Sequence, residues 1–333
     1  MITKIYFIEN SFDYNALNIN DNIIAGSEKT LINISNELSK NNNLLIKVFN
    51  NTTKPKTINN VQWFNISQIK KNDKADFVIS MSDANLFYKL SGKKNYLWSH
   101  SVQNFEKFLR KKQLAPFIKF KPILLLEGEY HYKTRSYLTS FYGKKTLKIA
   151  ADYDFINTKI NINFIPPPNA IFTTRSDRNL NFLIQSWLEI KKNNKNSKLF
   201  INPPHILSDN EKANDIILRT KGDKKLLIND LLNTRLFMSP GHKGEVFCLA
   251  AEEARELCIP IITMGYGSLY ERVEHNVTGY IASNQDDFIK YSNNILKDDD
   301  IFKDFRKNLI NRKNSRNYKK VKKDFLKILN IND

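Results

Sequence analysis

Cysteine is nearly absent from the sequence, which has only Cys248 and Cys258 in 333 residues. A predicted helix spans most of the gap between them, which disfavours a disulfide and fits a reducing compartment. No stretch reaches the ~18 apolar residues of a membrane span, and the first ten residues lack the apolar run of a signal peptide. Neither a Walker A loop nor a G-x-G-x-x-G pattern occurs, which excludes the usual phosphate loops of kinases and Rossmann dehydrogenases. We therefore expect a cytoplasmic protein.

Acidic residues are scarce relative to basic ones. The chain has 52 Lys and Arg against 34 Asp and Glu, a formal net charge of +18. A basic surface attracts nucleic acid, anionic lipid or phosphorylated substrates. With 41% hydrophobic residues the chain is globular, and its length suffices for two domains, each with its own core.

Short apolar runs alternate with amphipathic segments through the first half. The segment 26–40 is expected to be a helix with Ser27 as its N-cap, because Leu31, Ile34 and Leu38 recur at helical spacing. Strands separated by helices predict a parallel sheet with helices on both faces. The expected strands are 4–8, 44–50, 61–65, 76–80, 95–100, 122–126 and 147–151.

The triple proline 166–168 interrupts this alternation, and three consecutive prolines suit a linker. After it the alternation restarts, with expected strands 169–176, 198–204, 235–240 and 259–265. We expect an α/β protein of two doubly wound parallel-sheet (Rossmann-like) domains facing across a cleft. The predicted domains are residues 1–160 and 161–316, and the basic helix at about 317–333 is expected to pack back on the first.

The stretch GHKGEVFCLAAEEARELCIPII, residues 241–262, follows one of these strands and leads into a helix expected to begin near Val246 or Phe247. Open α/β sheets bind ligands at the carboxyl ends of their strands. The first N–H groups of such a helix lack helical partners and carry the positive end of its dipole, so they can hold a phosphate or sugar hydroxyls.

Two glutamates stand at this helix mouth, Glu245 in the loop and Glu253 in the helix. Phe247, Ala250, Ala254 and Leu257 are expected to form the buried stripe. In the simplest structural interpretation Glu245 only favours the helix dipole. In that interpretation the three helix acids, Glu252, Glu253 and Glu256, form a solvated face.

This stretch resembles the signature of retaining GT-B glycosyltransferases, the large family that includes sucrose and lipopolysaccharide sugar transferases. Two glutamates have seven residues between them, Ala254 follows the second, and Pro260 opens a strand. Residues 265–282 resemble the family's Gly-rich loop and the Thr-Gly before its last strand. Val246 and Cys248 depart from it, since glycines usually stand there. The resemblance implies a GT-B architecture and transfer of a sugar from a nucleotide-diphosphate sugar with retention of anomeric configuration.

Three weaker matches extend the resemblance. Gly26 and Ser27 resemble the glycine-rich loop that approaches the donor phosphates, and His100 takes the place of a histidine near the donor sugar. Arg175 and Arg178 take the places of an arginine and a lysine that grip the diphosphate, so the second is Arg where Lys is customary.

Each of these residue types suits its implied role. Glu245 can accept hydrogen bonds from donor-sugar hydroxyls, and Glu253 can accept both ribose hydroxyls. Backbone donors at Phe247, Cys248 and Leu249 can meet the phosphates. Negative charge grows on the departing diphosphate, so two fixed arginines lower the barrier and no metal or other cofactor is required beyond the donor substrate.

A second interpretation remains open, a non-catalytic basic protein of GT-B fold that binds nucleic acid or anionic surfaces. Its patches would be residues 105–112 and the C-terminal helix. No RNA-binding motif that interleaves aromatics with those bases is present, which disfavours nucleic acid. Basic patches also suit an enzyme that meets a glycan or lipid-linked acceptor peripherally, at the inner face of an anionic membrane. The glutamates and arginines together favour the enzyme.

Asp152 and Asp154 mimic a metal-binding Asp-x-Asp but lack its context.

Overall fold

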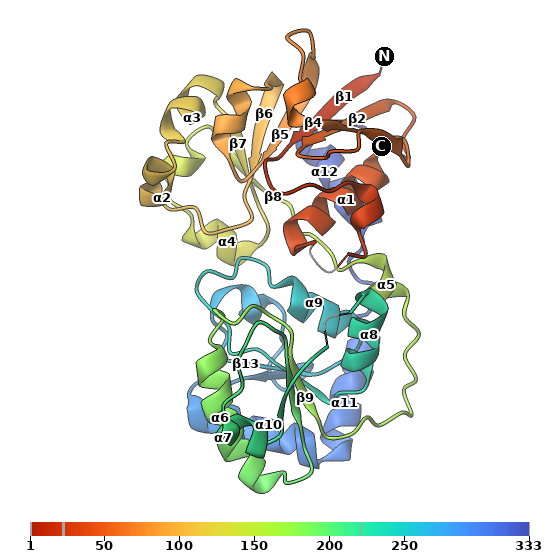
Figure 1. Ribbon diagram of the computed structural model, residues 1–333, viewed down its shortest axis with the longest axis vertical. Helices are drawn as coiled ribbons and strands as arrows, with labels where there is room; N and C mark the ends of the chain where they lie inside the picture. Colours follow the sequence, from red (N-terminus) through yellow and green to blue (C-terminus); the bar gives the residue numbers. More distant parts are fainter. Residues whose placement is uncertain (1, 22–23, 221, 333) are drawn as a thin grey trace. The chain divides into compact units, whose positions relative to one another are not determined.

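The computed structural model describes residues 2–21, 24–220 and 222–332. The chain divides into two compact units (Figure 1): unit 1 is Met1–Ala150 with Tyr318–Asp333, and unit 2 is Ala151–Asn317. The sequence analysis puts the boundary at residue 160. The division falls earlier because α5 (Tyr153–Asn157) packs on α9 (Leu249–Glu256) of unit 2.

Unit 1 contains, within the described residues, an eight-stranded sheet of order β3-β4-β2-β1-β5-β6-β7-β8. Only the edge strand β3 is antiparallel to its neighbour there. In the central strand β1, Phe7 pairs in register with Val48 on one side and Ile79 on the other. The strands are β1 (Thr3–Ile8), β2 (Leu44–Asn50), β3 (Lys56–Ile58), β4 (Val61–Asn65), β5 (Ala75–Met81), β6 (Gly92–Trp98), β7 (Ile123–Leu126) and β8 (Lys144–Thr146).

Helices cover this sheet. The expected apolar stripe of α1 is buried, with Leu31, Ile34 and Leu38 each 0% exposed. The last helix, α12, belongs to unit 1 although it ends the chain, because Phe325 packs its ring against Phe7 and Trp98. The helices of unit 1 are α1 (Gly26–Leu38), α2 (Phe105–Arg110), α3 (Leu114–Phe120), α4 (Glu129–Thr134) and α12 (Tyr318–Leu329).

Unit 2 contains, in its described part, a six-stranded parallel sheet of order β11-β10-β9-β12-β13-β14. The strands are β9 (Ala170–Phe172), β10 (Leu199–Ile201), β11 (Ile216–Leu218), β12 (Leu236–Met238), β13 (Ile261–Thr263) and β14 (Gly279–Ile281). Its other helices are α6 (Leu180–Asn193), α7 (Asp209–Ala213), α8 (Lys224–Leu232), α10 (Gln285–Lys297) and α11 (Asp299–Ile310).

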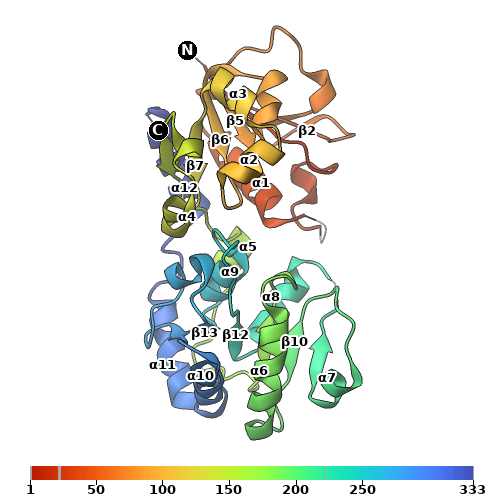
Figure 2. The same ribbon diagram turned by 90° about the vertical axis from the view of Figure 1, so that its left-hand side faces the viewer.

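Alternation along these strands fills two cores, one on each face of the sheet. Ala170 and Phe172 join one core with α6, α10 and α11, whereas Ile171 joins the other with α5, α8 and α9. α6 and α10 lie side by side (Figures 1 and 2). This arrangement of two doubly wound parallel-sheet units confirms the predicted fold class.

Three local predictions are wrong. Residues 147–151 are not a strand, since β8 lies earlier and pairs with β7 as an edge strand. α1 begins at Gly26 with Ala25 as its N-cap, so Ser27 lies inside the first turn. α9 begins at Leu249 because Cys248 has a left-handed backbone (φ 57°), and such a residue interrupts the helix. In the described part of the chain we find no helix with the length and apolarity needed to cross a bilayer.

Candidate active site

Three loops of unit 2 meet where neighbouring parallel strands end. They follow β9, β12 and β13, which are adjacent in the sheet. The Asn179 amide donates a hydrogen bond to the Gly241 carbonyl, and Gly241 forms a β-bridge with Tyr266. The Ser268 N–H donates to the Glu245 carbonyl at 2.9 Å. The loops therefore form one connected cluster that carries Arg175, Arg178 and Glu245.

Close backbone approach makes one glycine of this cluster obligatory. Gly267 has φ +68°, and a Cβ there would lie 2.3 Å from the His242 carbonyl oxygen and 2.8 Å from that of Glu245. Any side chain would push the Glu245 loop away. The sequence pattern shows the glycine, but not which backbone it touches.

Arg178 bridges the two loops. Its Nε lies 3.0 Å from Glu245 Oε2, and its Nη1 lies 3.0 Å from His242 Nδ1. His242 Nδ1 also accepts the Gly244 N–H at 2.9 Å, so the proton of the neutral imidazole belongs on Nε2. Arg178 and Glu245 are predicted site residues, and the structure brings them into direct contact.

The Glu245 carboxyl group is mostly buried, with 19% of its side chain exposed. Burial raises its pKa, an effect that the Arg178 charge opposes but does not cancel. A carboxylate that is stabilised by a helix dipole would have a lowered pKa. The raised pKa of Glu245 therefore argues against the interpretation in which this acid only favours the dipole.

Arg175, the other predicted phosphate ligand, is differently placed. Its side chain is 76% exposed, and Nη2 lies 2.7 Å from Asp177 Oδ2. Such an exposed pair contributes little to stability and can be exchanged for a ligand at low cost. The loop thus has one arginine that Glu245 and His242 fix in place, Arg178, and one that faces solvent, Arg175.

The helix mouth lies later than the sequence predicts. With α9 starting at Leu249, the N–H groups of its first turn come from about Leu249 to Ala251. Phe247 is 4% exposed, its ring lies 3.9 Å from the Arg272 guanidinium carbon, and its carbonyl accepts the Arg272 Nε–H at 2.8 Å. Phe247 and the buried Cys248 therefore hold the loop in place, and Leu249 is the one of these three that opens the helix.

The helix acids are not a solvated face. Glu252, Glu253 and Glu256 are 2%, 7% and 0% exposed, because α5 and α11 cover sides of α9 that the apolar stripe does not predict. Glu252 pairs with Arg255 at 2.5 Å, and Glu256 accepts the Asn314 N–H at 2.8 Å. The structural interpretation of these acids is wrong as to exposure, and Glu253 remains the candidate ribose acceptor.

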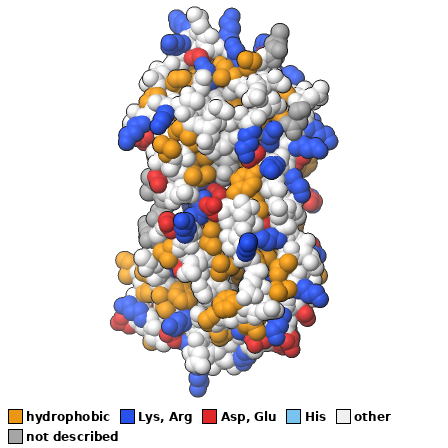
Figure 3. Space-filling view, turned by 90° about the vertical axis from the view of Figure 1, so that its right-hand side faces the viewer, with side chains coloured by type: hydrophobic (Ala, Val, Ile, Leu, Met, Phe, Trp, Pro, Cys, Tyr) orange, Lys and Arg blue, Asp and Glu red, His pale blue; other side chains and the backbone are white. Residues whose placement is uncertain are grey.

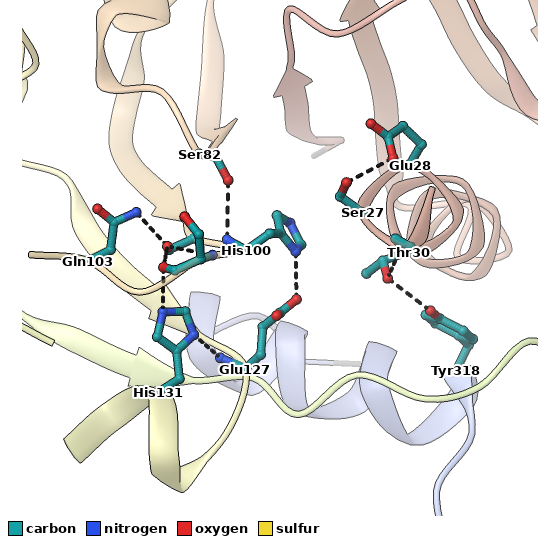
Figure 4. Close-up of polar contacts among 12 residues, drawn as sticks. Ser27, Glu28, Thr30, Ser82, His100, Gln103, Glu127, His131 and Tyr318 are labelled. Atoms are coloured by element: carbon teal, nitrogen blue, oxygen red, sulfur yellow. Dashed lines mark hydrogen bonds and ion pairs between the residues drawn. The ribbon is translucent and has the colours of Figure 1, made fainter. Parts of the chain in front are cut away.

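In unit 1, His100 follows β6 and its Nδ1 lies 2.6 Å from Oε1 of Glu127, which follows β7 (Figure 4). Gly26 and Ser27, half-buried, open α1, and the Ser27 hydroxyl donates to Glu28 at 2.8 Å. Residues 22 and 23 of the preceding loop lie outside the described residues. The structure places the predicted His100 beside a carboxylate that sequence reasoning missed.

Three buried carboxylates that act on His100 escaped the sequence analysis: Glu9, Glu28 and Glu127 are 6%, 6% and 3% exposed. Glu9 accepts the Tyr14 hydroxyl, and burial raises the pKa of Glu9. A signal existed, because Glu9 and Glu127 each directly follow an apolar strand, where parallel sheets bind ligands.

The Asp-x-Asp of unit 2 serves a structural purpose. Lys224 Nζ lies 2.7 Å from Asp152 and 2.9 Å from Asp154, which ties α5 to the start of α8. Across residues 2–21, 24–220 and 222–332 no group of three or more His, Cys, Asp or Glu side chains could hold a metal ion.

Residues 173–316 match the family model described as glycosyl transferases group 1. A search of curated proteins finds no match. Among solved structures, the sucrose-phosphate synthase (tll1590) of Thermosynechococcus elongatus is similar at 12% identity and a TM-score of 0.72, with 98% of each chain covered.

Two further solved structures are similar over 98% of this chain and 99% of theirs. HepE (Alr3699) of Anabaena, in complex with UDP and glucose, has 12% identity and a TM-score of 0.72. WaaG, a glycosyltransferase involved in lipopolysaccharide biosynthesis, has 11% identity and a TM-score of 0.69. At such identities these likenesses show the fold. The protein thus has the GT-B fold, and the match of its residues 173–316 to the glycosyl transferases group 1 model supports a glycosyltransferase.

Proposed function

We propose that the protein transfers a glycosyl group from a nucleotide-diphosphate sugar to a glycan or lipid-linked acceptor, with retention of anomeric configuration and without a metal cofactor. The observation that carries the proposal is the bridge from Arg178 to Glu245 and His242, at the carboxyl ends of β9 and β12 within the group 1 domain. The UDP-bound relative of the same fold supports the donor class.

The reaction breaks the bond between the anomeric carbon and the diphosphate and forms a bond from that carbon to the acceptor oxygen. Negative charge develops on the leaving oxygen, where Arg175 and Arg178 supply fixed positive charge. The acceptor proton passes to the departing phosphate, on the face from which the acceptor attacks. Glu245 positions the sugar and meets positive charge at the anomeric centre, and it is not assigned as a covalent nucleophile.

Nucleoside diphosphates should stabilise the protein against heat in the presence of EDTA, because arginines and helix N–H groups take the place of a metal. At ~100 times the dissociation constant the stabilisation is about 2.7 kcal/mol. Thermal unfolding is followed for wild type, Arg178→Gln, and the matched control Arg312→Gln, which removes an exposed pair with Glu274. Loss of the shift with EDTA would disprove metal independence, and an equal shift in Arg178→Gln would remove Arg178 from the site. A glycan product of inverted configuration would disprove retention.

The acceptor side carries a concentrated basic surface in residues 105–148 of unit 1. This segment contains 11 Lys and Arg against three Asp and Glu, so it holds eight of the chain's 18 surplus charges in about an eighth of its length. Six large apolar or aromatic side chains are exposed there: Leu109, Ile118, Tyr132, Tyr137, Leu138 and Phe141. The Arg135 guanidinium carbon lies 4.3 Å from the Tyr132 ring. On the face drawn in Figure 3, by contrast, basic side chains are scattered among acidic and uncharged ones.

Aromatic and basic side chains together suit the interface of an anionic bilayer. The peripheral contact with the membrane is therefore proposed to use this surface. Exchanging Lys111 and Lys112 for Glu should lower binding to phosphatidylglycerol-containing vesicles by at least ~2 kcal/mol, roughly 30-fold. The control exchanges Lys290 and Lys297 of unit 2, which are also exposed. Equal losses in both pairs would refute a specific surface, and preference for RNA over vesicles would favour the non-catalytic basic protein.

A further inference from the structure

The imidazole of His100 is fixed at one nitrogen and open at the other. Its Nδ1 lies 2.6 Å from Glu127 Oε1, and the two side chains are 13% and 4% exposed. Its Nε2 is buried and, within the described residues, has no hydrogen-bond partner. The His100 N–H donates to Ser82 Oγ at 3.2 Å, so the backbone is also anchored (Figure 4). Nε2 is thus the one polar atom of the ring left for a ligand.

A second histidine braces Glu127. His131 Nδ1 accepts the Glu127 N–H at 3.2 Å, and its Nε2 donates to the Ser101 carbonyl at 3.0 Å (Figure 4). His131 is 0% exposed, and burial lowers its pKa to about 4, so it stays neutral near pH 7. Because Ser101 directly follows His100, the neutral ring ties the Glu127 backbone to the loop that carries His100. The His100–Glu127 pair is therefore held by its own side-chain contact and by the His131 ring, which links the backbones of the two loops.

The groups that face His100 come from four elements. Glu9 follows β1, Glu28 lies in α1, Glu127 follows β7, and His131 lies in α4. Burial alone would lower the pKa of His100, but the carboxylates, Glu127 foremost, more than offset it and raise the pKa. In Figure 4 the ring points to the side on which Ser27 and Glu28 open α1.

We propose that Glu127 is a positioning residue: it keeps a proton on His100 Nδ1 and fixes the ring so that Nε2 presents itself to a hydroxyl group of the substrate sugar. This inference rests on the proposed function, because the hydroxyl belongs to the transferred or accepting sugar. In the charged ring Nε2–H donates to the hydroxyl oxygen, and in the neutral ring Nε2 accepts from the hydroxyl. His131 acts one step further back, through the Glu127 backbone.

The test compares Glu127→Gln and Glu127→Ala with Glu129→Gln, a matched exchange of an exposed glutamate that pairs with Lys133 on the surface. Gln keeps a hydrogen-bond acceptor for Nδ1–H and removes the charge, whereas Ala removes both. Release of nucleoside diphosphate from the sugar nucleotide is measured against pH. We expect Gln to move the His100-dependent inflection of kcat/KM to lower pH, and Ala to lower kcat/KM by at least ~10-fold, the scale typical of losing a residue that orients a functional histidine. Glu129→Gln should match wild type.

A variant-free measurement accompanies it, a pH titration of the imidazole ¹⁵N resonances of the wild-type protein. His100 should titrate above ~6.5, the ordinary histidine value, and His131 far below it. An unshifted inflection in Glu127→Gln, or a His100 that titrates below ~6.5, would overturn the positioning role. Nucleotide binding, measured by thermal shift, separates the two proposals. If nucleotide binds but the inflection of kcat/KM is unchanged in Glu127→Gln, only this inference is wrong. If the protein neither binds nucleotide nor turns over the sugar nucleotide, the proposed function is wrong as well.

Discussion

The exchange Glu245→Gln separates catalysis from stability, because the structure gives the two quantities opposite signs. Gln keeps the shape and removes the charge that positions the sugar. Glycosyl transfer should fall by at least ~100-fold, about 2.7 kcal/mol of transition-state stabilisation, as for loss of one preorganised electrostatic contact. Affinity for a bare nucleoside diphosphate should hardly change, because that ligand has no sugar for Glu245 to contact.

The effect of Glu245→Gln on stability should be opposite in sign to its effect on turnover, and it should depend on pH. The folded-state pKa of Glu245 is raised above its unfolded value, about 4.3, so its contribution to stability is fully present below that value and is lost as pH rises through the folded pKa. At low pH the neutral Glu245 resembles Gln beside Arg178. The melting temperature of Glu245→Gln relative to wild type should therefore rise between about pH 4 and pH 7.

Both readouts come from one pair of proteins, with turnover of the sugar nucleotide, calorimetric nucleotide binding and thermal unfolding at several pH values. A melting temperature that falls relative to wild type as pH rises would mean that the ion pair with Arg178 is net stabilising, and the reasoning from burial would be wrong. Near wild-type turnover would reduce Glu245 to a loop acid and put the non-catalytic protein ahead.

Two further exchanges test the same cluster. Glu253→Ala should weaken nucleotide binding by about 1.5–3 kcal/mol, since ribose hydroxyls lose a charged acceptor, and a 2′,3′-dideoxynucleotide should bind wild type and variant alike in calorimetry. If the variant still prefers the intact ribose, another group reads it. Gly267→Ala should lower turnover at least as much as Glu245→Gln, because its Cβ would displace the Glu245 loop. The control is Gly143→Ala in unit 1, which also has a positive φ (+119°) but whose Cβ would meet only Ile123 side-chain carbons, at 3.7 and 3.8 Å. Unchanged turnover in Gly267→Ala would show that the loop has room to move.

The fold could be predicted from the sequence because periodicity reports burial directly. Alternating strands and helices gave both sheets, and the proline run marked the break between them. The boundary itself moved to Ala150 because Lys224 pairs with Asp152, a contact across more than seventy residues that no local pattern contains. Residues 147–151 are apolar except for Lys148 and yet do not form a strand, because buried loops also carry apolar side chains.

Site residues could be proposed from the sequence where they belong to a spaced motif. They could not be proposed where they come together only through pairing between distant segments. Sequence matches put Glu245 and Arg178 in loops that follow strands, yet their contact depends on β9 and β12 being neighbours in the sheet, which no local pattern contains. Glu127 has no motif, and its pairing with His100 depends on two strands being adjacent in the sheet. The start of α9 was misplaced because the left-handed backbone of Cys248 is set by its neighbours and not by its own preference.

Carboxylates that are buried at or after strand ends cost stability, because the charged group loses its contact with water. Stability alone would favour apolar side chains at Glu9, Glu127 and Glu245, because burying a carboxylate requires donors to compensate it. Each has a donor that a ligand hydroxyl can replace or join: the Tyr14 hydroxyl, the His100 imidazole or the Arg178 guanidinium. Under the proposed function, this cost is explained because these acids recognise hydroxyl groups of the substrates.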